Sequence, residues 1–571
     1  MESGRRFTLR WYAARAVPCP DGGWIGTDGN AERKVSTTSV GHAYVMAETA
    51  APPTDARSRA KEPRRIGPGI VVGSICAAVA IGVAQLTAGI VNPEASPIVA
   101  VGGTAIDATP EWLKGFAIRT FGANDKRVLL AGIGVTLAVV AVVIGVAAVR
   151  RPMAGYAGLA VFGLVGVAAA LTRPDGAPID ALPSITGGLA GALMLWMFLP
   201  AVAPSFATPA PVRTTPTGID RRRFFLTGAA GAAAAVVAGG AGRVFAQRFE
   251  ADASRAAVHL PSSAVTSPAR AGTDLTVPGL SPFITSNAEF YRVDTALLVP
   301  AVKAEDWRLR IHGMVDHEMT LTFDQLMNRP LIERDITLNC VSNEVGGGYI
   351  GNARWLGTRL ESILDEVGVD PTADQLVSRS VDGFTVGTPT AVAMDGRDAM
   401  LAIAMNGEPL PLDHGFPVRM LVPGLYGYVS ATKWVVDIEL STFDAFDAYW
   451  IRRGWAQQAP VKTASRIDTP RANARLDAGT VPVAGVAWAQ HRGIASVDLR
   501  ADDGPWMPAR LSAEDTVDTW RQWLVMWDAT PGDHLLEVRA TDQTGAVQTE
   551  ASAPPFPDGA TGYHAIVVQV T

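Results

Sequence analysis

Five apolar stretches in the first half of the chain constrain its fold more than any other feature of the sequence. Each has close to the ~20 residues that a helix needs to cross a lipid bilayer, and charged residues rarely interrupt them. Helices buried in one large soluble core are the alternative, but five such runs in series favour a membrane region. The stretches lie at about 69–91, 128–149, 153–172, 185–203 and 224–244.

Arginines that flank these stretches predict which side of the membrane each end faces. Arg64–Arg65 precede the first stretch, Arg150–Arg151 separate the second from the third, and Arg221–Arg223 precede the fifth. Cytoplasmic loops carry an excess of Lys and Arg, so these sites are predicted to face the cytoplasm. The loop 92–127 argues against this orientation, because it also carries Lys and Arg. We expect a multi-pass protein of the cell membrane whose part after residue 246 is extracytoplasmic.

The fifth stretch carries a second signal. "RRRFFLTGAAGAAAAVVAGGAG" places two arginines just ahead of Phe225–Leu226 and resembles the twin-arginine export motif, which serves proteins that fold before export. A plain positive-inside anchor is the alternative. Val244–Ala246 is a poor cleavage site, so we expect the segment to stay in place as an anchor.

The composition excludes several classes of function. A net charge of −6 leaves no basic stripe for nucleic acid, and three cysteines are too few for a disulfide framework. No histidine lies between His42 and His259, so the apolar stretches offer no paired ligands for haem, and no haem is expected. They also carry almost no ionisable residues, which favours an anchor or docking surface over an ion pathway.

The sequence divides into five predicted parts. A disordered leader is predicted first, because it is rich in Ala, Pro, Arg, Ser and Thr and lacks periodicity. We expect translation to start at Met46 within it, with residues 1–45 an over-extended gene prediction. A Pro/Ser/Thr/Ala-rich linker follows the membrane region. The leader, membrane region, linker, first soluble domain and second soluble domain are predicted at 1–65, 66–246, 247–284, 285–462 and 463–571.

Strands and short helices alternate in the first soluble domain. "DWRLRIHGMV" and "RDITLN" are predicted strands, and Thr322 fits the N-cap of a short helix. Leu360, Ile363, Leu364 and Val367 share one face of a predicted helix. An α+β domain is therefore expected.

From about Ala474 onward, apolar and polar residues alternate one by one, as in a β-strand. "VPVAGVAW", "ASVDLRAD", "HLLEVRATD" and "HAIVVQVT" are separated by turn residues, which predicts an immunoglobulin-like β-sandwich. Trp520, Trp523 and Trp527 are interpreted as packing residues rather than as a ligand platform.

Cys340 is the one cysteine in the predicted soluble half. "ITLNCVSNEVGGGYIGNARWLG" places it at the end of a predicted strand, beside three glycines that let the backbone approach something bulky. A small buried residue, a nucleophile with His312 or His414 as its base, and a thiolate ligand of a soft metal are the open interpretations. A disulfide lacks a partner in the same compartment.

A second motif, "NGEPLPLDHGFPVRMLVPGLYGYVSATKW" from Asn406 to Trp434, changes the weight of these alternatives. With it, the chain after about residue 285 resembles the sulfite oxidase family of molybdenum enzymes. "TLNC" matches the family's metal-ligating cysteine, and "GVAWAQHRGIASVDLRADDGPW" matches its immunoglobulin-like dimerisation domain. The resemblance implies a molybdopterin-binding oxidoreductase domain at 285–462 and a homodimer through the domain at 463–571.

Matched position by position, the resemblance implies roles for individual residues. Cys340 would ligate molybdenum and take part in catalysis, and Arg292 and Tyr426 are further candidates for the catalytic site. A pterin phosphate favours Arg, Lys, hydroxyl and N–H donors, which "PGLYGYVSATK" supplies in one loop. The implied cofactor-binding residues are Asn287, Phe290, Tyr291, Asp382, His414, Arg419, Ser430, Ala431, Thr432 and Lys433.

The sequence departs from sulfite oxidases at two substrate positions. Sulfite oxidases carry an arginine a few residues after the metal cysteine, whereas "CVSNEVGGG" has Glu344 in that neighbourhood and no arginine; Ile403 stands in place of the family's tyrosine. The resemblance therefore implies two-electron oxygen-atom transfer on a small or protein-bound sulfur or nitrogen oxide, without pointing to sulfite. An external electron carrier is expected as partner. The alternatives are a membrane-anchored binding or scaffold protein with a retained but inactive molybdopterin fold, and a hydrolase that uses the Cys340 thiol.

Overall fold

The computed structural model describes residues 66–110, 125–173, 176–202, 221–246, 251–261, 265–266 and 270–571, together with Leu113, Phe116 and Thr120. The predicted leader, including Met46 and residues 1–45, lies outside the described residues. The bounds of the five predicted parts remain predictions.

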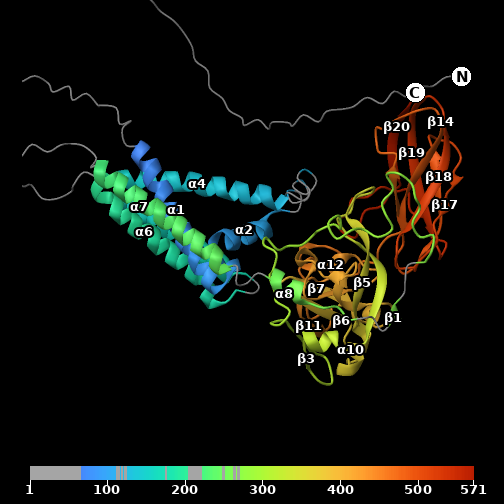
Figure 1. Cartoon of the computed structure of the whole chain (residues 1–571), viewed down its shortest axis with the longest axis horizontal. Helices are drawn as coiled ribbons and strands as arrows, with labels where there is room; N and C mark the ends of the chain where they lie inside the picture. The colour runs from blue at the N-terminus through green and yellow to red at the C-terminus, as the bar shows by residue number, and fades with distance from the viewer. Residues whose placement is uncertain are drawn as a thin grey trace, which may run out of the picture. The chain divides into compact units, whose positions relative to one another are not determined.

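Among the described residues, five helices are long and apolar enough to cross a membrane (Figure 1). Large apolar side chains point outward from them, since Val135, Leu164 and Trp196 are 65%, 67% and 64% exposed. Such exposure is compatible with contact with lipid. The five helices are α1 (Ile66–Val91), α4 (Asp125–Arg150), α5 (Pro152–Leu171), α6 (Leu182–Val202) and α7 (Arg221–Ala246).

Glycines let these helices approach closely. A Cβ added at Gly73 of α1 would overlap the backbone of Ala141 in α4, and one at Gly89 of α1 would overlap Gly242 in α7. Small residues at such crossings are typical of helices that associate in lipid, where packing and not water exclusion drives association.

A further helix, α2 (Pro97–Ala108), lies in the stretch that the sequence assigned to a loop. Its 12 residues are too few to span a bilayer, so the apolar-length criterion missed it. Two polar contacts hold the segment just before α2. The Arg173 guanidinium, after α5, pairs with Glu94 at 2.5 Å, and Asn92 donates to Asp180, before α6, at 3.3 Å.

Two mixed sheets build the central region, which we define as β1–β11 (Val265–Ser441). The first has the order β1-β4-β5-β8-β10, with β9 paired to β8, and the second has the order β3-β2-β11-β6-β7. The strands of the first are β1 (Val265–Thr266), β4 (Leu331–Asn339), β5 (Ile350–Arg359), β8 (Met400–Met405), β9 (Glu408–Pro409) and β10 (Arg419–Leu421). The second contains β2 (Arg308–Gly313), β3 (Met319–Thr322), β6 (Gln375–Ser380), β7 (Thr385–Pro389) and β11 (Val435–Ser441).

The predicted short helix forms as α9 (Phe323–Met327). The Thr322 hydroxyl accepts a hydrogen bond from the Gln325 N–H at 3.1 Å, and the Gln325 side-chain oxygen accepts one from the Thr322 N–H at 2.8 Å, which completes a capping box. The predicted apolar helix face is also confirmed: the buried residues of α10 (Leu360–Val367) are Leu360, Ile363, Leu364 and Val367.

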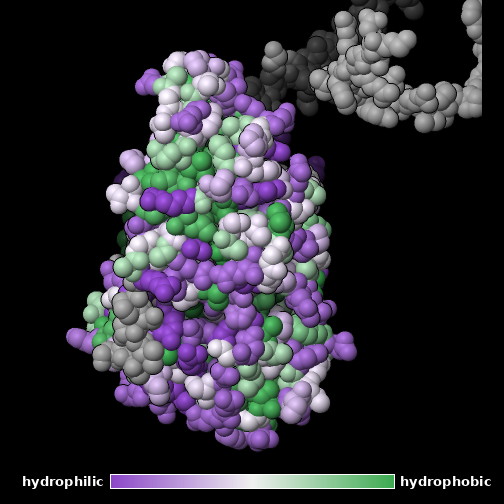
Figure 2. Space-filling view, turned by 90° about the vertical axis from the view of Figure 1, so that its right-hand side faces the viewer, coloured by the Kyte–Doolittle hydropathy of each residue, from purple (hydrophilic) through white to green (hydrophobic). Residues whose placement is uncertain are grey.

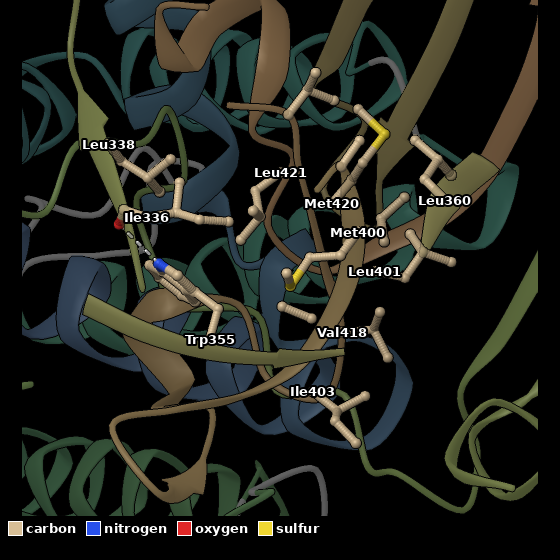
Figure 3. Close-up of a cluster of buried hydrophobic side chains, with 14 of the residues drawn as sticks. Ile336, Leu338, Trp355, Leu360, Met400, Leu401, Ile403, Val418, Met420 and Leu421 are labelled. Carbon is tan, nitrogen blue, oxygen red and sulfur yellow. Dashed lines mark hydrogen bonds between the residues drawn. The ribbon is translucent and has the colours of Figure 1, made fainter. Parts of the chain in front are cut away.

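The core of the central region lies on the first sheet (Figure 3), where side chains from β4, β5, β8 and β10 converge. Trp355 is fully buried there and donates from Nε1 to the Ile336 carbonyl at 3.1 Å. Ile403, which replaces a substrate-site tyrosine in the predicted family, is also fully buried in this core. Burial of apolar surface is the main stabilising term of such a sheet.

The C-terminal β region (β12–β20, Ala464–Val570) consists of two sheets over one apolar core. One has the order β12-β14-β18-β17, the other β13-β20-β19-β15-β16. The three tryptophans predicted to pack are 2%, 0% and 5% exposed in chain order. The strands are β12 (Ala464–Thr469), β13 (Arg475–Leu476), β14 (Gly479–Trp488), β15 (Ile494–Ala501), β16 (Met507–Pro508), β17 (Arg510–Leu511), β18 (Arg521–Ala529), β19 (Gly532–Asp542) and β20 (His564–Val570).

The surface of this half differs from that of the long helices. Figure 2 shows a face on which hydrophilic residues predominate and apolar residues are scattered. Scattered single apolar residues are normal on a water-exposed surface. The residues after the five apolar helices therefore present a more polar surface than those helices do.

Candidate active site

The Cys340 loop (Cys340–Tyr349) joins β4 to β5, and Asn343 forms hydrogen bonds with both of its ends. The Cys340 N–H donates to the Tyr349 carbonyl at 2.9 Å, and the Asn343 N–H donates to the Cys340 carbonyl at 3.0 Å. Asn343 Oδ1 accepts from the Tyr349 N–H at 2.8 Å. Cys340 is a free thiol that is 9% exposed, and burial raises its pKa, opposed by Ser342 and by the positive charge of Lys433.

Two of the three glycines of this loop lie close to other groups, whereas nothing lies within 4 Å of a Cβ placed on Gly348. Gly346 has φ +76°, and a Cβ there would overlap Cδ2 and Nε2 of the His564 imidazole. A Cβ on Gly347 would lie 2.6 Å from Asn343 Oδ1. Two of the three glycines are therefore required by close approach.

Aromatic rings connect the N-terminal part of the predicted site to β5. The Phe290 ring stacks on Tyr291 at 5.2 Å and meets His414 and Trp355 edge-on at 5.5 and 5.8 Å. Gly351 of β5 makes room, since a Cβ there would lie 2.8 Å from the Phe290 ring. Burial raises the pKa of the Tyr291 phenol, and the charges of Cys340 and Arg419 also act on it. Tyr291 thus lies in electrostatic reach of both.

Arg419 is a buried cation with few partners. It is 5% exposed, its Nη1 donates to the His414 carbonyl at 3.2 Å, and its guanidinium lies 5.0 Å from the Trp355 ring centre. Within the described part of the chain, its Nε has no hydrogen-bond partner and no carboxylate forms an ion pair with it. Burial lowers its pKa to about 10.

Lys433 is the second cation of the site. Its Nζ donates to Asp294 Oδ2 at 2.7 Å and to the Asp413 carbonyl at 3.0 Å. Burial nevertheless lowers its pKa to about 8, because desolvation outweighs the Asp294 charge. Arg292 belongs to the same group, since it donates to Asp294 at 2.9 Å and lies 3.6 Å from Asp413. The structure thus places Arg292 with Lys433.

His414 and Asn287 are linked through the chain. His414 Nε2 lies 3.2 Å from the Asn287 carbonyl oxygen, and Asn287 Oδ1 accepts from Asn406 Nδ2 at 2.8 Å. Burial, together with Arg419 and Lys433, lowers the pKa of His414 to about 4. His414 is therefore neutral at physiological pH.

The hydroxyls of the predicted phosphate loop already have hydrogen-bond partners, within the loop for Ser430 and on β6 for Thr432. Ser430 Oγ donates to the Leu425 and Tyr426 carbonyls at 3.0 and 3.1 Å, and Thr432 Oγ1 lies 2.6 Å from Ser378 Oγ. Ala431 closes the turn through its N–H to the Gly427 carbonyl at 2.9 Å. These side chains hold the loop that carries Lys433.

Asp382 lies in the turn between β6 and β7. Its Oδ1 accepts from the Phe384 N–H at 3.3 Å, and the neighbouring Val381 N–H donates to the Trp434 carbonyl at 3.0 Å. The turn thus reaches the residue next to Lys433.

A cavity of about 320 Å³ lies between the Cys340 loop and the C-terminal β region. Tyr426, Asn343 and Glu344 are among the residues that line it from the central region, and Lys462 and Trp488 are among those on the other side. Tyr426 is 4% exposed, and its hydroxyl accepts from the Lys462 N–H at 3.4 Å. Burial raises the pKa of Tyr426 to about 12, so its phenol keeps its proton.

The two histidines considered as bases for a Cys340 nucleophile both have other partners. His312 Nε2 lies 2.9 Å from Asp437 Oδ2 on β11, and His414 contacts the Asn287 carbonyl. Nothing in this arrangement favours the hydrolase alternative.

A negatively charged cofactor fits the group that we call the basic cluster (His414, Arg419 and Lys433). Buried cations without compensating anions are costly, and an anion that bonds to the unpartnered Arg419 Nε removes that cost. In the described part of the chain, no group of three or more His, Cys, Asp or Glu converges on one point. A metal at Cys340 whose other ligands come from the cofactor is consistent with that arrangement.

Comparisons with known proteins agree with this site. The family model of the oxidoreductase molybdopterin binding domain matches residues 296–450. Human mitochondrial sulfite oxidase is 30% identical over 323 residues, which are 48% of this chain and 58% of that protein. The uncharacterized oxidoreductase YuiH of Bacillus subtilis is 34% identical over 149 residues, 26% of this chain and 72% of that protein.

One solved structure can be compared as well. The sulfane dehydrogenase SoxCD of Paracoccus pantotrophus is similar with a TM-score of 0.45 and 24% identity, over 51% of this chain and 82% of that chain. This chain also spans only 58% of the length of human sulfite oxidase.

The site and the matched domain define a molybdopterin-dependent oxidoreductase. Within that class, the chain belongs to the sulfite oxidase family.

Several residues of the site were not found from the sequence. Asp294 compensates Lys433, Asn406 supports Asn287, and Arg466 and His564 contact the Cys340 loop. Of these residues, only Asn406 has a local sequence signal, because "NG" predicts a turn. The roles of Asp294, Arg466 and His564 depend on contacts between distant segments.

Acid should destabilise this protein between about pH 6.5 and pH 4. The pKa values of His414 and His564 are lowered by burial from 6.5 to about 4 in the folded chain. In that window the unfolded chain binds protons that the folded chain does not, so stability is lost as pH falls. We expect the denaturation midpoint of the detergent-solubilised chain to drop from pH 7 to pH 5. The drop should be smaller than in the parent for His414→Gln and His564→Gln, and equal to that of the parent for His259→Gln, which removes an exposed histidine. The same drop in the parent and all three variants would refute the role of His414 and His564 in acid destabilisation.

Proposed function

We propose that this protein is a membrane-anchored molybdenum-cofactor oxidoreductase. It catalyses two-electron oxygen-atom transfer on a small or protein-bound sulfur or nitrogen oxide outside the cytoplasm and exchanges electrons with an external carrier. The observation that carries the proposal is the buried basic cluster next to the Cys340 loop within the matched domain, in which Arg419 has no carboxylate partner among the described residues. An apolar scaffold protein would gain nothing from burying such charge.

The proposed roles follow from the contacts of each residue. Cys340 is the thiolate ligand of the metal, and the basic cluster binds the pterin and its phosphate. When bound, the metal–pterin group supplies the redox and oxygen-transfer chemistry. The chain would hold it: Phe290 and Tyr291 would pack beside it, Asn287 orients His414 through its carbonyl oxygen, and the remaining predicted residues shape the loops. Arg292 shields Lys433 rather than reaching substrate.

The cavity beside the Cys340 loop is the proposed substrate site. The charged groups named on its wall are Glu344 and Lys462, and the Lys462 ammonium is already paired with Asp558 at 2.9 Å. An oxyanion needs an excess of positive charge that this wall does not offer. A neutral oxide, such as a sulfoxide or an amine N-oxide, fits better. Tyr426 is a candidate to contact it.

Metal and pterin analysis of the purified full chain tests the cofactor. The parent is expected to carry molybdenum and pterin. Cys340→Ser should lose activity while pterin still binds, and Arg419→Ala should lose pterin. Arg510→Ala, which removes an exposed arginine in the C-terminal β region, is the matched control and should resemble the parent. Full activity of Cys340→Ser, or a parent without molybdenum, would rule the proposal out.

A substrate screen with artificial electron carriers tests the cavity. We expect kcat/KM for dimethyl sulfoxide-type and amine N-oxide substrates to exceed that for sulfite, because the cavity wall offers no free cation. Glu344→Gln should reduce the difference in kcat/KM between the neutral oxides and sulfite, because it removes a negative charge that repels sulfite. Sulfite as the best substrate would contradict the neutral-oxide assignment while leaving the cofactor assignment intact.

Anchoring, export and assembly are further parts of the proposal. Five long helices with outward apolar side chains support a multi-pass membrane protein, and Arg222–Arg223 at the start of α7 fit twin-arginine export. The two sheets over one core support an immunoglobulin-like C-terminal domain, through which a homodimer would form.

Protease treatment of sealed membrane vesicles checks the topology. In right-side-out vesicles, protease should reach the chain after residue 246, and in inside-out vesicles this part should be protected. Arg222→Lys/Arg223→Lys should trap the C-terminal half on the cytoplasmic side if export uses the twin-arginine route. Normal export of that variant would indicate a plain anchor instead.

A further inference from the structure

We propose that Arg466 and His564 of the C-terminal β region are positioning residues for the Cys340 loop. They hold the loop from the side opposite the central region and thereby fix where the Cys340 sulfur lies. The inference rests on the proposed function, because it gives the sulfur its metal-binding role. Both residues lie outside the 296–450 stretch that the family model matches.

His564 acts by contact. Its imidazole lies against Gly346, where any side chain would overlap Cδ2 and Nε2 of the ring. The ring cannot rotate freely, because its Nδ1 accepts from the Ile467 N–H at 3.0 Å. Burial and the nearby Arg466 lower the pKa of His564 to about 4, so the ring is neutral and its proton is on Nε2, facing the loop.

Arg466 acts by a hydrogen bond. Its Nη1 donates to the Gly347 carbonyl at 2.8 Å, so it holds the residue next to the one that His564 contacts. The guanidinium is fixed by two other bonds, from Nε to Asp468 at 2.6 Å and from Nη2 to Ser281 Oγ at 3.1 Å. Asp468 also compensates the charge of Arg466. The bond from Arg466 to the loop is therefore not needed to neutralise its charge.

The loop needs support of this kind. Three successive glycines leave its backbone more conformational freedom than any other residues would, and ordering them costs entropy. Inside the loop, the Gly347 N–H donates to the Glu344 carbonyl at 2.8 Å, and Asn343 links Tyr349 to Cys340. A restraint applied at Gly346 and Gly347 is therefore passed on to Cys340 through short hydrogen bonds. The C-terminal β region completes the active site in addition to any role in assembly.

The rate at which Cys340 is alkylated tests whether the loop is held in place, and it does so independently of enzyme activity. The assay uses the metal-free full chain in detergent with Cys19→Ser and Cys76→Ser, so that Cys340 is the one remaining thiol. We expect His564→Ala and Arg466→Ala to raise the alkylation rate of Cys340 by about tenfold or more, because local opening governs access to a buried group. Arg539→Ala is the matched control: it removes a part-buried arginine of β19 that pairs with Asp498 at 3.2 Å and should leave the rate unchanged.

Conservative and reciprocal variants separate positioning from simple misfolding. Arg466→Lys keeps the charge next to Asp468 but loses the fork geometry, so it should fold normally and still loosen the loop. Gly346→Ala should disturb the loop strongly, and His564→Ala should relieve part of that effect in the double variant, which independent sites would not show. In the metal-loaded enzyme, Arg466→Lys should lower kcat more than it changes KM.

The outcomes distinguish this inference from the proposed function. Unchanged Cys340 reactivity in His564→Ala and Arg466→Lys, with normal melting temperatures, would overturn the positioning role and leave the cofactor assignment standing. A parent without molybdenum would remove the proposed function, while the accessibility result would still report whether the loop is held.

Discussion

The antiparallel pairing of β4 with β5 is the interaction on which the rest of the site depends. Its register sets Asn339 opposite Ile350, so Cys340 leaves the sheet where the loop begins. The same strand pair places Gly351 beneath Phe290 and Trp355 beneath Arg419. Side chains alternate along a strand, so a one-residue slip would turn every one of these residues to the other face.

Burial of positive charge gives the site its chemical character. Arg419 and Lys433 lie in the interior, where Asp294 pairs with Lys433 and no carboxylate of the described residues pairs with Arg419. The pKa values of both cations fall because water is excluded. Removing charged groups from water costs more than a single ion pair returns. An anion that bonds to Arg419 would offset that cost, and the phosphate of the proposed pterin is such an anion.

The C-terminal β region contributes to the same centre from a distant part of the chain. It forms one wall of the cavity and contacts the glycines of the Cys340 loop through Arg466 and His564. The central region alone carries the matched family domain, but its loop is bounded on one side by another region. A catalytic loop rich in glycine is adaptable, and neighbouring rigid elements decide which of its conformations is populated.

Features that depend on local periodicity and on contiguous motifs could be predicted from the sequence. It located the long apolar helices, the period-two strands, the Thr322 cap and the buried face of α10, and it singled out Cys340, His414, Arg419 and Lys433. Contacts between separate segments became known only from the folded chain: Arg292 pairs with Asp294, Thr432 bonds to Ser378 of β6, and Gly346 lies against the ring of His564. Periodicity records which face of an element is buried, whereas contacts between distant segments depend on how whole sheets pack, and no short stretch of residues encodes that.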